Sequence, residues 1–530
     1  MQLLSAYLPV ALGCLVVLVL AGKVQNYLEA QAFAHKNGTQ PARKLPQWEQ
    51  WVGIQNVLEM LRAARNHGIL ELGLRRYTAM GKTFETKALG RSFTHTIDPE
   101  NIKTVLSTNF KDFAVGQRID TLGPLLGSGI FTTDGAAWEH SRALVRPTFA
   151  KLQVSNLDTY EEHVSHLINL IPSNGATVDL APLFFRLTID AATEVLFGRS
   201  LNTLQKSPDS EEHMFMRAFD TAQSKAHFRP RNWFVANYIF RDADWDAALV
   251  TVHSFVDRYI SNALRKRCAS SPASTAPTGP GSKAAGEQGD DDGDDSCIVG
   301  PDGKKRYVFL YEMAKETSDP IELRHELLNV LLAGRDTTAS LLSNTFFVLS
   351  RRPDIWAKLK EEVDALGGVF PDYDTLRGMK YVKYLLNESL RLYPVVPLNS
   401  RIASRNTVIP HGGGPDGQAP VTIGKGEGVS YSVYAMHRRK SVFGDDAHEF
   451  EPERWARSDM RPGWSYLPFN GGPRICPGQQ FALTEASYVV VRLAQTFDRI
   501  ESRDPNPWTE GLGLTTVNLN GAKVALVKDA

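Results

Sequence analysis

The segment around Cys476 holds the residues of this sequence that are best suited to chemistry. It reads Phe469-Asn-Gly-Gly-Pro-Arg474-Ile-Cys476-Pro-Gly478 and leads into an apolar stretch with helical spacing at residues 481–497. Cys476 therefore stands where a loop enters a helix, and backbone amides together with the helix dipole favour its thiolate there. The alternative is an inert buried cysteine, and the fixed offsets of Phe, Gly, Arg and Gly from Cys476 argue against it. We expect a thiolate at this position.

A second polar group lies inside an apolar helical segment, Ala333-Gly334-Arg-Asp336-Thr337. The hydroxyl of Thr337 can donate to the carbonyl of Ala333, one helical turn earlier. An apolar surround would raise the pKa of Asp336, which suits that acid to proton transfer. Glycine inside a helix costs about 1 kcal/mol relative to alanine, so Gly334 indicates a close approach to the backbone. Taken alone, the string fits equally well a packed glycine beside an acid paired at the surface.

The helix that carries this group should be long and buried. Asp319 is a suitable N-cap, Pro320 occupies the first helical position, and an acid follows at Glu322. Because no further proline occurs until Pro353, the spacing predicts a helix of about 30 residues, or about 45 Å. Its middle is apolar on nearly every face, which indicates a central helix.

Two further segments accompany these strings: Glu388-Ser-Leu-Arg391 followed by Pro452-Glu-Arg454, and Trp138-Glu-His-Ser-Arg142. In this order, the four segments resemble landmarks of the cytochrome P-450 (haem-thiolate monooxygenase) family. The cysteine string resembles its haem-binding loop, and the Asp-Thr string resembles its oxygen-activating helix. Glu388, Arg391 and Arg454 resemble the buried triad that braces the haem loop. Glu-x-x-Arg occurs elsewhere in the chain, so only order and spacing from Cys476 single out Glu388.

The resemblance implies a mostly α fold with small β-sheets, formed by one large helical domain that binds haem b. It implies that Cys476 is the axial ligand of the iron, and that Asp336 and Thr337 deliver protons on the opposite face. Arg142, Arg401 and Arg474 are candidates for the haem propionates, although a surface ion pair is an equal alternative for Arg401. The implied cofactor-binding residues are Trp138, Arg142, Arg401, Phe469, Arg474, Cys476 and Gly478.

Composition excludes some functions and points to a redox partner. The 59 basic and 59 acidic residues give zero formal net charge, which excludes a polybasic nucleic-acid binder. The four cysteines lack C-x-x-C spacing, so neither a disulfide framework nor a zinc site is expected. Because the chain has no Gly-x-Gly-x-x-Gly fingerprint after a strand, electrons should come from another protein. By resemblance, that partner is an NADPH-cytochrome reductase, and O2 is the co-substrate.

The N-terminal region has the composition of a membrane anchor. Residues 1–22 carry no charge, and residues 3–22 are apolar enough to span a bilayer. A cleaved signal peptide is the rival, but a basic n-region is missing. Because the nearby cations all follow the span, we expect a single-pass protein of the endoplasmic reticulum membrane with a cytosolic catalytic domain. A linker at 23–46 and the haem domain at 47–530 should follow.

A polar, acidic segment interrupts this domain. Residues 268–305 are rich in Ser, Pro, Gly and Asp and have almost nothing to bury. We interpret the segment as a low-complexity loop inserted between two helices and not as a regulatory tail, because apolar helical patterns flank it on both sides.

The expected substrate is a hydrophobic small molecule. Several stretches, among them Leu332–Ala339, Pro397–Arg401 and Tyr431–Arg439, resemble the fungal branch that hydroxylates n-alkanes and fatty acids at or near the chain end. The same chemistry on a polyketide, a terpenoid or a lipid-tailed secondary metabolite remains open. A haem-thiolate isomerase or dehydratase, or a non-catalytic haem protein, would have little use for Asp336 and Thr337.

Overall fold

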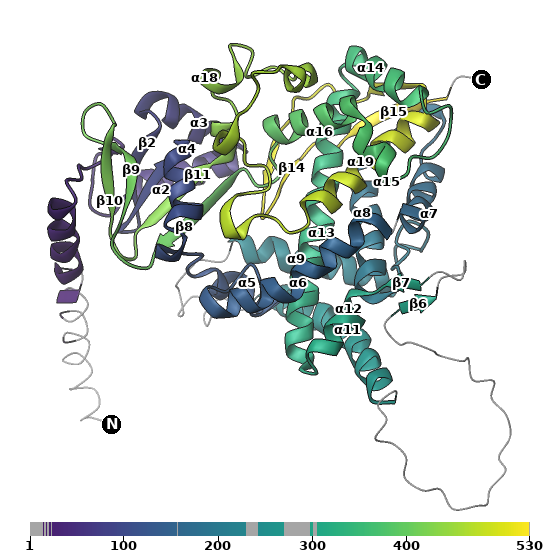
Figure 1. Cartoon of the computed structure of the whole chain (residues 1–530), viewed down its shortest axis with the longest axis horizontal. Coiled ribbons are helices and arrows are strands. Elements are labelled where there is room, and N and C mark those ends of the chain that lie inside the picture. The colour runs from purple at the N-terminus through teal and green to yellow at the C-terminus, as the bar shows by residue number, and fades with distance from the viewer. Residues whose placement is uncertain are drawn as a thin grey trace, which may run out of the picture. The chain divides into compact units, whose positions relative to one another are not determined.

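One long helix, α13 (Pro320–Leu349), organises the helical part of the protein (Figure 1). The computed structural model describes residues 14, 17, 21–22, 24–155, 157–228, 242–269, 297–299 and 305–528. The helix has 30 residues, and the carboxylate of its N-cap, Asp319, accepts a hydrogen bond from the amide of Ile321 at 2.9 Å. Most of its side chains are buried. The predicted start, length and burial of this helix are confirmed.

The described chain forms two compact units. The larger unit, at residues 117–395, 451–457 and 477–530, is mostly helical and surrounds α13. Short 3-10 turns are labelled η. The described helices and turns of this unit besides α13 are α5 (Arg118–Leu126), α6 (Gly135–Ser155), α7 (Leu157–Asn169), α8 (Leu180–Phe197), α9 (Glu211–Phe228), α11 (Ala243–Ala269), α12 (Phe309–Glu316), α14 (Pro353–Asp364), α15 (Tyr373–Gly378), α16 (Lys380–Leu392), η3 (Pro452–Ala456) and α19 (Gln479–Thr496).

Small sheets complete the larger unit. One has the strand order β12-β15-β5, and two are hairpins, β13-β14 and β6-β7. Apolar side chains from α5, α8, α9, α11 and α13 share one continuous core. The strands are β5 (Asn174–Asp179), β6 (Cys297–Val299), β7 (Lys305–Tyr307), β12 (Arg499–Ser502), β13 (Glu510–Leu512), β14 (Thr516–Asn518) and β15 (Lys523–Val527).

The smaller unit, at residues 1–116, 396–450 and 458–476, is built on a six-stranded sheet of order β1-β2-β3-β11-β8-β4 and on the β10-β9 pair. The strands are β1 (Arg43–Lys44), β2 (Thr83–Ala88), β3 (Arg91–Thr96), β4 (Phe113–Ala114), β8 (Leu398–Ala403), β9 (Thr407–Gly413), β10 (Ala419–Ile423) and β11 (Gly428–Ser432). The helices and turns are α2 (Ile54–Arg65), α3 (Ile69–Met80), α4 (Pro99–Lys103), the π-helical turn η1 (Thr104–Thr108), η2 (Phe110–Asp112), α17 (Val433–Met436), α18 (Lys440–Phe443), η4 (Gly463–Ser465) and η5 (Gly472–Arg474).

The expectation of a mostly helical fold with small sheets is confirmed by these elements. The expected anchor at residues 3–22 falls mainly outside the described residues. Within the part of the chain that is described, no helix combines the length and apolar character needed to cross a bilayer. Most of the expected loop at 268–305 also lies outside the described residues. At its ends, α11 extends to Ala269, and β6 pairs with β7.

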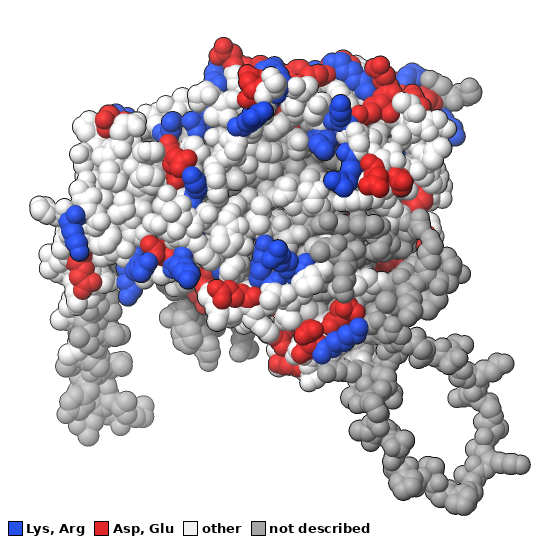
Figure 2. Space-filling model, in the orientation of Figure 1, with Lys and Arg blue, Asp and Glu red and all other residues white. Residues whose placement is uncertain are grey.

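Surface charge is mixed. Figure 2 shows basic and acidic side chains interspersed over the face drawn, with neither sign forming one continuous patch. This distribution agrees with the equal numbers of basic and acidic residues in the sequence.

Candidate active site

The cysteine segment forms a turn that ends at Cys476, three residues before α19 begins. The amide of Cys476 donates to the carbonyl of Phe469 at 3.0 Å, which closes the loop at the backbone. The side chain of Cys476 is exposed and is not part of a disulfide. Within the smaller unit, the fold therefore fixes the backbone at this cysteine.

Glycine is required at one point of this loop. Gly472 has φ +68°, and a Cβ there would lie 1.9 Å from the carbonyl oxygen of Leu106 in η1. Two neighbours add contacts of their own. Asn470, at φ +64°, accepts a hydrogen bond from the hydroxyl of Tyr431 at 3.0 Å. The guanidinium of Arg474 lies 6.0 Å from the centre of the Phe110 ring. The loop is thus seated against η1 and η2.

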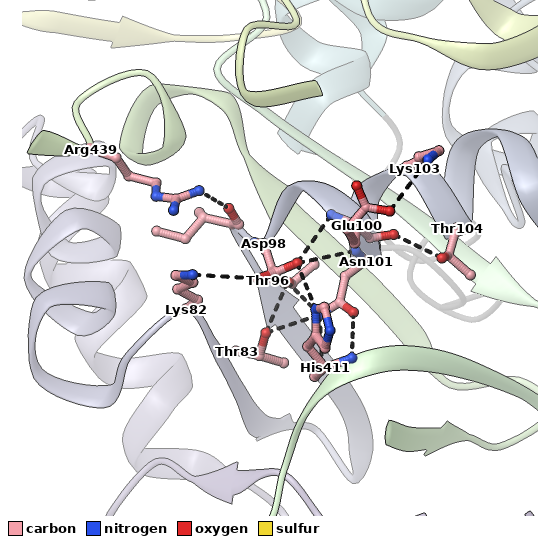
Figure 3. Close-up of polar contacts among 11 residues, drawn as sticks. Lys82, Thr83, Thr96, Asp98, Glu100, Asn101, Lys103, Thr104, His411 and Arg439 are labelled. Atoms are coloured by element: carbon pink, nitrogen blue, oxygen red, sulfur yellow. Dashed lines mark hydrogen bonds and ion pairs between the residues drawn. The ribbon is translucent and has the colours of Figure 1, made fainter. Parts of the chain in front are cut away.

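A cluster of polar side chains fixes α4, the helix that leads into η1 and so supports the cysteine loop (Figure 3). Asn101 of α4, which leads into η1, is fully buried. Its Nδ2 donates to the hydroxyls of Thr83 and Thr96 at 3.1 Å and to the carbonyl of His411 at 2.8 Å. Its Oδ1 accepts from the amide of His411 at 2.9 Å. Asp98 caps α4 and contacts the His411 ring at 3.2 Å. These bonds tie α4 to β2, β3 and β9.

Arg401 is also found in the smaller unit, on β8. Its side chain is 3% exposed, so the alternative of a surface ion pair does not describe it. Its Nη1 donates to Asn399 Oδ1 at 3.1 Å and to the carbonyl of Ser400 at 2.8 Å. Both acceptors are neutral, so this buried cation suits an anionic partner.

The other candidate cofactor residues belong to the larger unit. Trp138 is buried, and Arg142 follows one turn later on α6. Gly478 is the N-cap of α19, and a Cβ there would meet the ring of Phe149 at 3.0 Å. That ring also packs edge-on against Phe481, with centroids 6.2 Å apart. Glycine at 478 therefore allows α6 to approach the start of α19.

Glu388, Arg391 and Arg454 lie together and are fully buried. Arg391 donates to both carboxylate oxygens of Glu388, at 2.8 and 2.7 Å, and Arg454 Nε donates to one of them at 3.2 Å. Two groups that the sequence did not indicate complete the set. The indole of Trp455 donates to Glu388 at 3.0 Å, and the amide of Glu451 does so at 2.9 Å. These contacts join α16 to η3.

On α13, the hydroxyl of Thr337 donates to the carbonyl of Ala333 at 2.7 Å, as predicted. Asp336 is 2% exposed, and burial raises the pKa of its carboxyl above the usual range. This rules out the alternative of an acid paired at the surface. Gly334 is less constrained than expected, since a Cβ there would meet Ala192 at an ordinary 3.7 Å.

The surroundings of Asp336 are not purely apolar, and the expectation of an apolar surround was wrong in this respect. The amide of Gln223, on α9, donates to Asp336 Oδ2, and Arg335 Nη1 lies 3.2 Å from Oδ1. The same Arg335 Nη1 donates to Asp220, also on α9. Sequence reasoning missed Gln223 and Asp220, because nothing in the pattern of α9 distinguishes them from other polar residues of an amphipathic helix.

Comparison with known proteins decides the family. A family model described as "Cytochrome P450" matches residues 46–521, most of the chain and parts of both units. The chain belongs to the cytochrome P450 family. It is 44% identical to the cytochrome P450 monooxygenase himC of Aspergillus japonicus, over 98% of this chain and 89% of that protein. It is 43% identical to the monooxygenase fsdH of Fusarium heterosporum, over 95% and 86%. Cytochrome P450 52A13 of Debaryomyces hansenii is 40% identical, over 90% of each chain.

Membership makes this P450 a haem-dependent monooxygenase that uses O2, a redox partner and a hydrophobic substrate. Its described residues fit the haem. Cys476 offers a thiol that is not part of a disulfide, and Arg401 is a buried cation with neutral partners. A soft sulfur ligand and buried cations are the groups that an iron porphyrin with two carboxylates requires.

Proposed function

We propose that this P450 hydroxylates an unactivated C–H bond at or near the end of a fatty acid or n-alkane chain, with electrons from an NADPH-cytochrome reductase. Cys476 serves as the axial ligand in this proposal. Trp138, Arg142, Arg401, Phe469, Arg474 and Gly478 hold the cofactor. When bound, a thiolate-ligated haem activates O2 and inserts one oxygen atom into the substrate.

The substrate proposal is supported by three apolar positions of the larger unit which, by resemblance to the family, lie around the substrate. Val330 of α13 and Val395 are buried, and Leu514, which follows β13, packs against the same core as Val330. The amide of Thr516 donates to the carbonyl of Val395 at 2.9 Å, and the carbonyl of Thr516 accepts from Ser340 of α13. These bonds hold the β13-β14 hairpin beside α13. Apolar side chains without charge suit an alkyl chain, which supports the resemblance to the alkane and fatty-acid branch.

The test of this proposal is a product map. Membranes that contain the protein, a reductase and NADPH are incubated with straight-chain fatty acids and n-alkanes of graded length, and mass spectrometry locates the oxidised carbon. We expect oxygen at the terminal carbon or next to it, only when the reductase is present. Turnover of a polycyclic terpenoid or a polyketide, with none of the straight chains, would favour the alternative substrate class instead.

Proton supply is assigned to Asp336 and Thr337 of α13. The carboxyl of Asp336 holds a proton readily because burial raises its pKa. The hydroxyl of Thr337 can rotate away from the carbonyl of Ala333 and pass a proton onward through water. In this arrangement Asp336 stores the proton and Thr337 Oγ1 directs it.

Replacing Thr337 tests this assignment. Thr337→Ala should retain haem and substrate binding and release more hydrogen peroxide and less product per NADPH. Its rate of product formation should fall by about 10²-fold or more. Thr337→Ser keeps the hydroxyl and is the matched control, so its coupling should stay near that of the wild type. Equal coupling in all three proteins would show that Thr337 has only a structural role.

Membrane attachment is also proposed, with residues 3–22 as a single anchor in the endoplasmic reticulum and the catalytic units in the cytosol. Support comes from the uncharged N-terminus and the cations that follow it. In the smaller unit, Trp48 and Trp51 are 71% and 83% exposed, as suits residues at a lipid interface. A variant without residues 3–22 should lose attachment that resists alkaline extraction. If that variant stayed attached, the anchor would lie elsewhere.

A further inference from the structure

The carboxyl of Asp336 is held by one side chain of its own helix and by one side chain of another helix. Gln223 of α9 donates to one carboxylate oxygen, and Arg335 contacts the other at 3.2 Å. Asp336 and Arg335 are each 2% exposed, so neither reaches solvent directly. Because one bond comes from α9, the orientation of this acid depends on where α9 lies.

Arg335 is shared between two acids. Its Nη1 contacts Asp220 of α9 and Asp336 of α13, and its guanidinium lies 5.2 Å from the ring centre of Phe185 and 5.9 Å from that of Phe219. The side chain of Asp220 is 50% exposed, whereas that of Asp336 is 3% exposed. One cation thus connects a carboxylate at the surface to a carboxyl in the interior.

We propose that Gln223 and Asp220 are positioning residues for Asp336. Gln223 fixes one carboxyl oxygen directly, and Asp220 acts through Arg335, which it keeps from pairing with Asp336 alone. The proposal rests on the role of Asp336 in proton supply given above. It assigns to α9 a part in that supply, because two of its side chains set the position and the ionisation of the acid.

Gln223 and Asp220 change the pKa of Asp336 in opposite directions. Burial raises the pKa of Asp336, Arg335 and the hydrogen bond from Gln223 lower it, and the negative charge of Asp220 raises it. Among the described residues, the charged groups that act on this carboxyl are Arg335 from α13 and Asp220 from α9, while α8 contributes the apolar ring of Phe185 beside Arg335. Removing the charge of Asp220 should therefore lower the pKa of Asp336, and removing the amide of Gln223 should raise it.

The experiment reads the ionisation of Asp336 in the resting protein. Infrared difference spectra between each protein and its Asp336→Asn counterpart isolate the C=O stretch of this protonated carboxyl across a pH series. We expect Asp220→Asn to shift the midpoint of that band to lower pH and Gln223→Met to shift it to higher pH. Asp220 is half-exposed, and asparagine keeps the size of its side chain. Asp220→Glu restores the charge and should bring the midpoint back toward that of the wild type.

Glu211→Gln is the matched control. Glu211 also lies on α9 and is 54% exposed, but it pairs with Arg258 of α11 and not with Arg335. The Glu211→Gln variant loses one negative charge from α9, as Asp220→Asn does, and should leave the midpoint of the Asp336 band unchanged. A general effect of charge on α9 would instead shift the band in both variants.

A second readout separates this inference from the proposed function. The pH at which peroxide yield per NADPH changes should shift in the same directions as the infrared midpoint. If Asp336→Asn leaves coupling and its pH dependence unchanged, the proposed role of Asp336 fails. If that variant uncouples turnover while Asp220→Asn and Gln223→Met leave the midpoint unmoved, or shift it in the same direction, the positioning role is refuted and the proton role stands.

Discussion

Glu388 is the residue whose loss should destabilise this P450 most clearly. Its carboxylate is fully buried and accepts hydrogen bonds from Arg391, Arg454, Trp455 and the amide of Glu451. Glu388→Gln keeps the shape of the side chain and removes the negative charge that pairs with two buried guanidinium groups. Breaking a buried pair in this way costs about 3–5 kcal/mol, a large part of the about 5–15 kcal/mol that stabilises a typical domain.

Urea denaturation followed by circular dichroism measures this loss. The matched control is Glu453→Gln. Glu453 lies in η3 next to Arg454, and it and its partner Lys358 are 40% and 52% exposed. Exposed pairs contribute about 0–1 kcal/mol, so the control should remain near the wild type. Equal stability of the two variants would refute the reasoning, because it would show that the buried carboxylate does not balance the two arginines.

Two further outcomes are expected. Burial raises the pKa of Glu485 from 4.5 to about 8. Between these pH values the folded protein therefore holds a proton that the unfolded chain has lost. The free energy of unfolding should fall by about 5 kcal/mol as the pH rises through that window. Glu485→Gln should flatten this dependence in denaturation midpoints measured between about pH 5 and pH 8, and an unchanged slope would contradict the assignment. Gly472→Ala should lower haem content, because its Cβ would lie 1.9 Å from a backbone oxygen at φ +68°. Gly73→Ala, where a Cβ meets nothing within 4 Å, should bind haem normally, and equal haem content in both variants would show that the loop tolerates a side chain.

Local signals in the sequence were enough to predict several parts of this structure. The cap at Asp319 and the absence of proline up to Pro353 defined α13, because helix ends depend on neighbouring residues. The bond from Thr337 to Ala333 followed for the same reason, since its two residues are one turn apart. The juxtaposition of Glu388 with Arg454 required the family resemblance, because they are 66 residues apart.

The contacts that could not be predicted depend on how helices and strands pack. Gln223 and Asp336 are 113 residues apart, and which face of α9 meets α13 is decided by the whole core around them. Asn101 and His411 are 310 residues apart and meet only because β9 lies beside α4. Asn101 and His411 are residue types that are also common at protein surfaces. The pattern of a single sequence therefore does not indicate that they meet.

The identity of the haem ligand is the central claim, and the carbon monoxide difference spectrum of the reduced protein tests it most directly. Cys476→Ser should lose the Soret band that is typical of thiolate ligation. Cys268→Ser and Cys297→Ser, which change the other two cysteines that follow the proposed anchor, should keep it. Retention of the thiolate band in Cys476→Ser, or its loss in either control, would contradict the assignment of Cys476 and with it the account of the site given above.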